Sequence, residues 1–336
     1  MAESVTVLLT SGGSDNSLIL RQSPGRRPSW SNVRFVTHRS EIEPVDWWVI
    51  CHSSAITQPL SAKCDPNHTV FISMEPPVWG RPEGFYNQFS YLVSCDTNVK
   101  HPNLIQKNGL TWWAGLKVKF EEGHRISNFS SYDYDSFSSM EIPEKRDRIS
   151  VITSTKNFFP GHRKRLRFIE KLRRHPVSEY IDFFGGYHNP LEDKLDGLLD
   201  YKYHIALEND TIDNWWTEKF ADPLLAYTLP IYYGCTNISD YFPKGSYLPI
   251  NINNFGESVA IIKKALNEDA YSKQLGEIKA SRNMVLNEYN ILQLISDICQ
   301  EPARETRLVT IYPQSSFPVS QKSLLQRAVN RIKRYL

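Results

Sequence analysis

The stretch Tyr201–Ile250, YKYHIALENDTIDNWWTEKFADPLLAYTLPIYYGCTNISDYFPKGSYLPI, decides the fold of this chain. Within it, Tyr203–Leu207 and Pro230–Tyr233 are short apolar runs, which predict strands. The segment Thr217–Tyr227 between them predicts a helix, with Thr217 as its N-cap. Polar residues at fixed spacing between apolar strands are typical of an α/β domain that holds a ligand at the carboxyl ends of its strands. The stretch therefore predicts an α/β domain with a ligand site.

Composition narrows the class of protein. The 336 residues suffice for two domains, and 40% hydrophobic with 23% charged residues is typical of a globular protein. The net charge of +2 argues against a dedicated nucleic-acid binder, so we expect no nucleic-acid partner. The five cysteines are odd in number and contain no CxxC pair, which favours a reducing compartment over a disulfide framework or a zinc site. The chain begins without a recognisable signal peptide and has no apolar run of about 18 residues, which predicts a cytoplasmic protein that does not span a membrane.

The rest of the chain predicts two α/β halves. In the first half, near-continuous apolar runs predict parallel strands covered on both faces, at Val5–Leu9, Val45–Ile50, Thr69–Ser73 and Tyr91–Ser94. In the second half we expect strands at Arg148–Thr153 and Ile181–Phe184, and helices at His162–His175, Ser258–Leu266 and Ala280–Cys299. Such halves indicate two facing doubly wound domains with the active site in the cleft. We place the first domain at 1–124, an exposed linker at 125–147, the second domain at 148–312 and a tail at 313–336.

The Trp-Trp-Thr-Glu-Lys cluster, Trp215 to Lys219, opens the predicted helix of the second half. Glu218 and Lys219 would lie in the first turn, at the positive end of the helix dipole, where an anion binds well. Lys219 would add a point charge that can meet a phosphate. On spacing alone, a capped surface helix with a solvated Glu-Lys pair is the more ordinary interpretation.

This cluster resembles the donor-nucleotide half of glycosyltransferase family 10, the α-1,3/4-fucosyltransferases, and is similar to bacterial members that make Lewis-type antigens on lipopolysaccharide. The resemblance implies a GT-B fold, with Glu218 on the ribose hydroxyls and Lys219 on the phosphates of the donor, beside Thr217. Trp215 stands where the family has Tyr, and an indole can stack but cannot replace the contact of a phenol hydroxyl.

Glu208 and Asn209 end an apolar strand, which is a good place for binding residues or an ordinary exit into a loop. The segment resembles the Phe-Glu-Asn-Ser motif of the family, with Leu207 in place of Phe and Asp210 in place of Ser. The resemblance implies that Glu208 and Asn209 lie at the nucleotide–sugar site.

A basic run, Arg163 to Arg167, lies near the start of the helix predicted at His162–His175. Such runs are usually a solvated face, but guanidinium groups also clamp diphosphates. The family carries an Arg at the start of this helix, two or three positions before an aromatic residue. Aligned on Phe168, the pattern indicates Arg165 as a donor-binding residue, with Arg163 and Arg167 as the alternatives.

Glu75 follows the strand at Thr69–Ser73 and precedes Pro76-Pro77. A carboxylate held at a strand end can serve as a base, although a surface loop is the more ordinary place for a Glu. The segment resembles the acceptor-side motif of the family, which implies that Glu75 is the catalytic base. By the same resemblance the acceptor side includes the residues Asn87, Tyr91 and Asp96.

Neither the histidines nor the acidic residues predict a metal site. The histidines show no metal-ligand spacing, and His204, within an apolar strand, is better interpreted as a satisfied core residue. Asp133-Tyr134-Asp135 has a DxD pattern but lies in the predicted linker. The resemblance implies that no metal or other cofactor is required, because Lys and Arg stabilise the leaving diphosphate.

The segment Val319–Leu336 places apolar residues at helical spacing among five basic residues. A basic amphipathic helix of this kind predicts peripheral contact with an anionic membrane surface, here the inner face of a bacterial inner membrane. The alternative is a helix docked on the core of the enzyme itself.

Together these features predict an inverting glycosyltransferase that moves L-fucose from GDP-fucose to a hydroxyl of an acceptor glycan in α-1,3/4 linkage. The resemblance implies a GlcNAc or Glc acceptor of a lipopolysaccharide O-antigen or a related oligosaccharide. One carboxylate base suffices for inversion, which agrees with the lack of a Ser-His or Cys-His constellation. Two alternatives stay open: the same fold with another nucleotide-hexose donor, and a non-catalytic glycan-binding protein.

Overall fold

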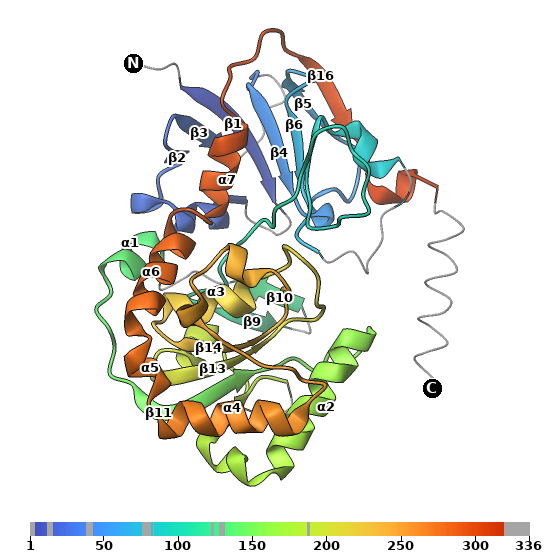
Figure 1. Ribbon diagram of the computed structural model, residues 1–336. Helices are drawn as coiled ribbons and strands as arrows, with labels where there is room; N and C mark the ends of the chain where they lie inside the picture. Colours follow the sequence, from blue (N-terminus) through green and yellow to red (C-terminus); the bar gives the residue numbers. More distant parts are fainter. Residues whose placement is uncertain are drawn as a thin grey trace. The chain divides into compact units, whose positions relative to one another are not determined.

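The computed structural model describes residues 4–11, 16–37, 43–75, 82, 84–121, 124–127, 132–186 and 189–318. The chain divides into two compact units (Figure 1). The first unit comprises Met1–Leu110 and Ile291–Leu336, and the second unit comprises Thr111–Asn290. The second unit is thus one continuous stretch of chain, inserted between two parts of the first.

The first unit is built on a seven-stranded sheet with the order β2-β3-β1-β4-β6-β7-β8. All neighbours pair in parallel except β2 with β3. The strands are β1 (Val5–Ser11), β2 (Ser29–Trp30), β3 (Val33–Val36), β4 (Trp47–Cys51), β6 (Thr69–Ile72), β7 (Tyr91–Val93) and β8 (Leu104–Ile105). Every residue of β4 and β6 is buried, which confirms the prediction of parallel strands covered on both faces.

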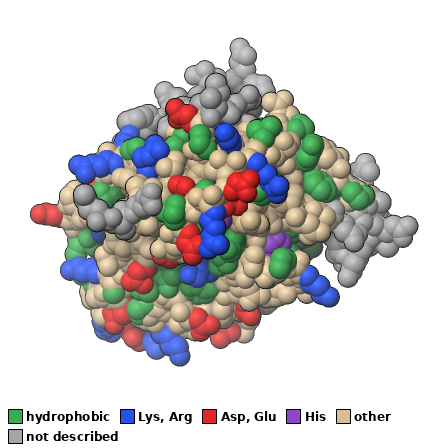
Figure 2. Space-filling view, turned by 90° about the horizontal axis from the view of Figure 1, so that it is seen from above, with side chains coloured by type: hydrophobic (Ala, Val, Ile, Leu, Met, Phe, Trp, Pro, Cys, Tyr) green, Lys and Arg blue, Asp and Glu red, His purple; other side chains and the backbone are tan. Residues whose placement is uncertain are grey.

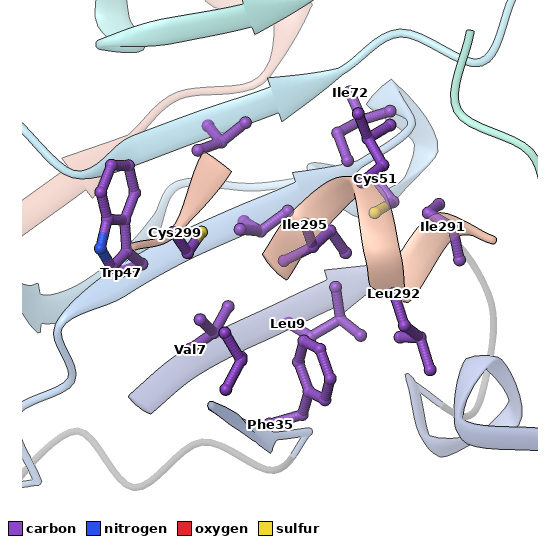
Figure 3. Packing of buried hydrophobic residues seen from close by; sticks show 14 of the residues in the cluster. Val7, Leu9, Phe35, Trp47, Cys51, Ile72, Ile291, Leu292, Ile295 and Cys299 are labelled. Atoms are coloured by element: carbon purple, nitrogen blue, oxygen red, sulfur yellow. The ribbon is translucent and has the colours of Figure 1, made fainter. Parts of the chain in front are cut away.

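One face of this sheet is covered by α7 (Ile291–Ile298), which returns the chain to the first unit. Figure 3 shows Ile291, Leu292 and Ile295 of α7 directed at Leu9 and Cys51 of the sheet. Full burial of each such aliphatic side chain contributes about 1.5–3 kcal/mol, so α7 is an integral part of this core. The predicted second domain, 148–312, therefore differs from the second unit, which ends before α7.

The short strand β5 (Leu60–Cys64) pairs antiparallel with β16 (Arg307–Ile311), so the end of the described chain is also bound to the first unit. Short 3₁₀ helices fill the connections of this unit: η1 (Asn16–Gln22), η2 (Pro24–Arg26), η3 (Ser53–Ala55), η5 (Phe85–Gln88) and η10 (Gln314–Ser316).

The second unit is built on a five-stranded parallel sheet with the order β12-β11-β13-β14-β15. Its strands are β11 (Arg146–Ile152), β12 (Ile181–Phe184), β13 (Tyr201–Leu207), β14 (Leu229–Tyr233) and β15 (Leu248–Pro249). Its helices are α1 (Tyr134–Ser139), α2 (Pro160–Arg174), α3 (Glu218–Leu225), α4 (Phe255–Asn267), α5 (Ala270–Lys273) and α6 (Leu275–Leu286). The second unit also contains an antiparallel hairpin of β9 (Val118–Glu121) and β10 (His124–Ser127). Its described 3₁₀ helices are η6 (Pro176–Tyr180), η7 (Lys194–Gly197), η8 (Ile238–Asp240) and η9 (Lys244–Ser246). The chain runs outward from β11 to β12 and then returns to the other side of β11 with β13, so the strand order reverses between β11 and β13.

Residues 132–147 of the region predicted as an exposed linker, 125–147, contain α1 and are part of the second unit. Phe137 of α1 is fully buried and meets Trp112 edge to face, with 5.8 Å between ring centroids. The buried guanidinium of Arg282 joins this helix to α3, because it donates to the carbonyls of Phe137 and Leu225. One aromatic side chain and one buried arginine thus anchor a segment whose Ser-rich composition indicates exposure.

The sequence also predicts a basic tail helix and no membrane-spanning segment. The predicted basic tail helix, Val319–Leu336, lies outside the described residues. Within the described part of the chain, every helix is too short or too polar to cross a bilayer. Figure 2 shows Lys and Arg side chains interspersed with Asp and Glu on the face that it draws, in keeping with the net charge of +2.

Candidate functional site

The carboxyl edge of the second sheet gathers most of the predicted site residues. Asn209 follows β13, Ser154 follows β11, and both α2 and α3 begin at this edge. Two glycines with positive φ, Gly185 and Gly186 at +79° and +58°, carry the chain away from β12, where a side chain at Gly185 would meet the Thr153 carbonyl. The strand order reverses here, and this is the place where doubly wound sheets bind ligands.

Glu208 fixes the start of α3. Its backbone extends the β13–β14 ladder by one hydrogen bond to Tyr233, and its side chain is fully buried. One carboxylate oxygen accepts from both the backbone N–H and the hydroxyl of Thr217, each at 2.8 Å. The side chain of Thr217 in turn caps α3, as predicted from the sequence. Glu208 and Thr217 therefore hold the helix N-terminus, with little surface left for a ligand.

Lys219 lies between two carboxylates. Its Nζ is 3.4 Å from Oε2 of Glu208 and 3.1 Å from Oε1 of Glu218. Burial opposes the charge of Lys219, but the two carboxylates raise its pKa above the usual value. Burial raises the pKa of Glu208. It also opposes the ionisation of Glu218, whose pKa is nevertheless lowered below its usual range by Lys219 and Lys194. The site thus keeps a cation and a carboxylate ionised side by side, in the first turn of a helix.

Lys194 and Asp222 extend this charge cluster, and sequence reasoning did not identify them. Lys194, at the start of η7, has its Nζ 3.3 Å from Glu218 and 3.6 Å from Asp222. Asp222 is 1% exposed and accepts the backbone N–H of Trp113 at 3.1 Å. Burial raises the pKa of Asp222 to about 6. These residues lie far apart in the sequence, and no local motif marks them.

Arg165 reaches the same edge from α2. One of its terminal nitrogens donates to the side-chain carbonyl of Asn209, and the other donates to Oγ of Ser154 at 3.2 Å. Its Nε is buried without a hydrogen-bond partner among the described residues. Of the three arginines considered from the sequence, Arg165 is buried, whereas Arg163 is partly exposed and Arg167 is exposed. The structure thus brings Arg165 and Asn209 together at this edge, whereas Arg163 and Arg167 are more exposed.

The start of α2 approaches Asn209 very closely. A Cβ on Gly161 would lie 1.6 Å from the carbonyl oxygen of Asn209, so only glycine fits there. This contact sets the position of α2, and with it the position of Arg165 one turn later.

Trp215 is 4% exposed, and its indole nitrogen is buried without a hydrogen-bond partner in the described part of the chain. In this conformation its ring presents little surface on which a ligand could stack. His204 is likewise buried, with Nδ1 2.8 Å from Oγ of Ser150 and a pKa that burial lowers to about 3. His204 is therefore a core histidine, as predicted.

The first unit places Glu75 three residues beyond the carboxyl end of β6. Its Oε1 is 2.9 Å from Nε2 of His52, which follows the neighbouring strand β4 and which sequence reasoning missed. Asp96 lies at the same edge of the sheet, beyond β7, and binds the backbone of Asn98. Tyr91 starts β7 at the opposite edge, where its ring packs 5.5 Å from Trp47, and Asn87 precedes it in η5. The structure therefore groups Glu75 and Asp96 at one edge and separates them from Asn87 and Tyr91.

The side chains at these two edges include no group of three or more His, Cys, Asp or Glu that could hold a metal ion, and the same is true of the rest of the described chain. The five cysteines are buried, and none of them forms a disulfide within the described part of the chain.

Residues 142–299 match the family model of the C-terminal domain of glycosyltransferase family 10 (fucosyltransferase). This stretch of the chain is thus similar to the C-terminal domain of family 10 fucosyltransferases. The match includes Arg165, Asn209, Glu218 and Lys219, so the charge cluster lies within the matched stretch.

Two curated relatives agree with this assignment. An α-(1,3)-fucosyltransferase B of Drosophila melanogaster is 30% identical over 125 residues, which are 36% of this chain and 28% of that protein. A GDP-fucose protein O-fucosyltransferase 3 of Homo sapiens is 32% identical over 87 residues, 24% of this chain and 18% of that protein. The chain thus spans less than a third of the length of these two relatives.

A crystal structure of an α1,3-fucosyltransferase with GDP-fucose has a similar fold, with a TM-score of 0.51 and 16% identity over 90% of this chain and 92% of that one. The likeness extends over both units and agrees with the fold class predicted from the sequence, an α/β protein of the GT-B type with parallel sheets.

Proposed function

We propose that this protein is an inverting glycosyltransferase that moves L-fucose from GDP-fucose to a hydroxyl of an acceptor glycan. The observation that carries the proposal is the charge cluster at the carboxyl edge of the second sheet, within the stretch that matches the family 10 model. There Lys219 and Arg165 lie near the N-termini of two helices, with Glu218 beside them.

The donor would bind at this edge. Lys219 and the helix N-terminus would meet the diphosphate of GDP-fucose, and Glu218 would accept hydrogen bonds from the ribose hydroxyls. Arg165 would stabilise the negative charge that grows on GDP as the sugar leaves, with Asn209 holding its guanidinium in place. Glu208 and Thr217 would act indirectly, by fixing the first turn of α3.

Glu75 would act as the general base. Its carboxylate would take the proton of the acceptor hydroxyl while that oxygen forms a bond to the anomeric carbon of fucose. The bond from this carbon to the diphosphate oxygen breaks, and GDP leaves with the bonding electrons. A single displacement inverts the anomeric centre, so GDP-β-L-fucose gives an α-linked product. No metal or other cofactor enters this scheme, because the cations of the second unit stabilise the leaving group.

We propose an α-1,3/4 linkage to GlcNAc or Glc of a lipopolysaccharide O-antigen or a related oligosaccharide. The Homo sapiens relative is named for transfer to protein, so a protein hydroxyl is the second candidate acceptor. The basic segment Val319–Leu336 would support an acceptor carried on lipid, through contact with an anionic membrane.

Calorimetric titration of the purified chain with GDP, GDP-fucose, GDP-mannose and UDP-galactose tests the donor. We expect binding of GDP and GDP-fucose that is lost in Lys219→Met and kept in Lys264→Met, a matched change on the exposed face of α4. Preference for another nucleotide sugar would indicate a different donor on the same fold. Binding of none of the four would contradict the proposal and favour a non-catalytic glycan-binding protein.

A further inference from the structure

The pair of His52 and Glu75 lies where two neighbouring parallel strands of the first unit end. His52 follows β4 directly, and its backbone N–H donates to the carbonyl of Ile72, the last residue of β6, at 3.0 Å. Glu75 follows three residues later. The two side chains meet with 2.9 Å between Nε2 and Oε1, and they remain 28% and 35% exposed. A substrate can therefore still reach the carboxylate.

The hydrogen bonds of His52 define its tautomer. The backbone N–H of Ser54 points at Nδ1 at 3.0 Å, and the Ser54 hydroxyl, which can turn its proton to the same nitrogen, lies 2.7 Å from it. A backbone N–H can only donate, so Nδ1 must present its lone pair, and the proton of the neutral ring lies on Nε2. The Nε2–H group then donates to Glu75. The turn at η3 thus prepares His52 as a donor aimed at one oxygen of the carboxylate.

The backbone of His52 is unusual. Its φ of +69° and ψ of 144° lie in a region that residues with a side chain rarely adopt. Strain of this kind persists where the surrounding structure over-determines the conformation, and it concentrates at functional sites. Here the strained conformation places the ring between the Ser54 N–H and the Glu75 carboxylate. A glycine would satisfy the backbone better but would lose both hydrogen bonds.

We propose that His52 is a positioning residue for Glu75, a role that rests on the proposed function of Glu75 as base. The Nε2–H group of His52 holds Oε1 of Glu75, so the other carboxylate oxygen is aimed at the acceptor hydroxyl. His52 itself exchanges no proton with the substrate. Misplacement of a catalytic group by about 1 Å costs about 10²-fold in rate, which is the size of effect that a lost positioning contact can have.

His101 offers a matched control in the same unit. Its Nδ1 faces the backbone N–H of Asn103 at 3.2 Å, and its Nε2 lies 3.0 Å from the carbonyl of Phe89. It therefore has the same hydrogen-bond pattern as His52, but it donates to a backbone carbonyl in place of a carboxylate.

The first test is nitrogen NMR of the full chain labelled with ¹⁵N in its histidine rings, with His52 assigned by substitution. We expect His52 as the neutral Nε2–H tautomer, with a signal that moves in Glu75→Gln, while His101 stays unchanged. A His52 ring protonated on Nδ1 alone, or a signal insensitive to Glu75, would overturn the proposal. This measurement needs no acceptor.

The second test is kinetic and uses GDP-fucose with N-acetyllactosamine and lactose as acceptors. We expect His52→Gly to lower kcat by about 100-fold with an unchanged KM for GDP-fucose and no loss of Tm, because glycine relieves the backbone. We expect His52→Gln, whose amide can donate to Glu75, to recover at least a tenth of the wild-type kcat, and His101→Gln to be neutral.

The outcomes separate the two proposals. Wild-type kcat in His52→Gly together with an inactive Glu75→Gln would overturn the role of His52 and leave Glu75 as base. Full activity in Glu75→Gln would overturn both roles.

Discussion

The two sheet edges that carry the candidate site residues use charge in opposite ways. At the edge of the first unit, the carboxylate of Glu75 meets the ring of His52, and both side chains are partly exposed. At the edge of the second unit, Glu208, Glu218 and Lys219 form a largely buried cluster in which each charge meets an opposite one. A base must be reached by its substrate, whereas a group that stabilises a leaving diphosphate works best when it is fixed and shielded from water. Under the proposed function, the first edge would contribute reactivity and the second edge would contribute a rigid electrostatic frame.

The largest effect is expected at the exposed edge. Glu75→Gln removes the base while keeping the shape of the side chain, and a general base contributes about 10²- to 10⁴-fold to a rate. We expect kcat to fall by that factor, with GDP affinity and Tm close to wild type because Glu75 lies outside the donor edge and is partly exposed. Steady-state transfer assays with calorimetry check this. A matched drop in GDP affinity would contradict the division of roles between the two edges.

Within the buried cluster, loss of one cation should affect both stability and binding. Lys219→Met keeps most of the side-chain volume but leaves the buried carboxylate of Glu208 without its nearest positive charge. Breaking a buried pair in this way costs about 3–5 kcal/mol of the free energy of unfolding. Urea denaturation measures this loss, and Lys219→Arg, which keeps the charge, should recover part of it. An unchanged unfolding free energy in Lys219→Met would show that the cluster is not the frame described above.

The pH dependence of the free energy of unfolding should reveal the raised pKa of Asp222. The pKa of Asp222 is about 6 in the folded state and 3.8 ordinarily. Between these pH values the carboxyl is therefore protonated in the folded state and ionised in the unfolded state. The contribution of Asp222 to the free energy of unfolding should therefore fall as pH rises from about 4 to about 6, by on the order of 3 kcal/mol. Asp222→Asn cannot ionise and can still accept from the Trp113 N–H, so it should lack this loss.

Denaturation of both proteins across this pH range tests the assignment. Asp240→Asn, the same change at an exposed position, serves as control and should keep the pH profile of the wild type. Parallel profiles for the wild type and Asp222→Asn would remove Asp222 from the cluster.

A smaller effect is expected at the start of α2. Gly161→Ala places a methyl group against the Asn209 carbonyl, so the helix must shift, and overpacking of this kind costs about 1–3 kcal/mol. The same shift should move Arg165 and weaken GDP binding. Gly256→Ala, in the first turn of α4 with no described atom within 4 Å of the added Cβ, should be neutral or slightly stabilising. Equal Tm values for the two variants would contradict the tight approach of α2 to Asn209.

The smallest expected effect is that of chelation. If Arg165 and Lys219 provide the positive charge for the leaving group, EDTA should change the transfer rate by less than about twofold. A large loss that added Mg²⁺ or Mn²⁺ restores would require a metal on the donor.

Local signals in the sequence predicted most elements of the second unit. The predicted strands Tyr203–Leu207 and Pro230–Tyr233 correspond to β13 and β14, and the predicted N-cap at Thr217 begins α3. The predicted helix at His162–His175 corresponds to α2. These features depend on periodicity and capping, which are properties of short segments.

The features that the sequence did not predict depend on packing between residues that are distant in the sequence. The stretch Ala280–Cys299 predicts one helix, but α6 ends at Leu286 and α7 begins at Ile291, where the buried side chain of Asn290 donates to the Leu286 carbonyl. Lys194, Asp222 and His52 acquire their roles only from partners that are distant in the sequence, at separations of 23 to 28 residues. No motif marks such pairs, so sequence reasoning could not identify them.

The return of the chain through α7 has a consequence for the order of folding. The second unit is one continuous stretch, Thr111–Asn290, so its residues are all available during synthesis before α7 leaves the ribosome. The first sheet has to wait, because Leu9, Val49 and Cys51 stay without the cover of α7 until residues 291–298 arrive. Uncovered apolar sheet surface invites aggregation, and contacts across nearly 300 residues form slowly. The part of the chain that is made first, Met1–Leu110, therefore belongs to the unit that finishes folding last.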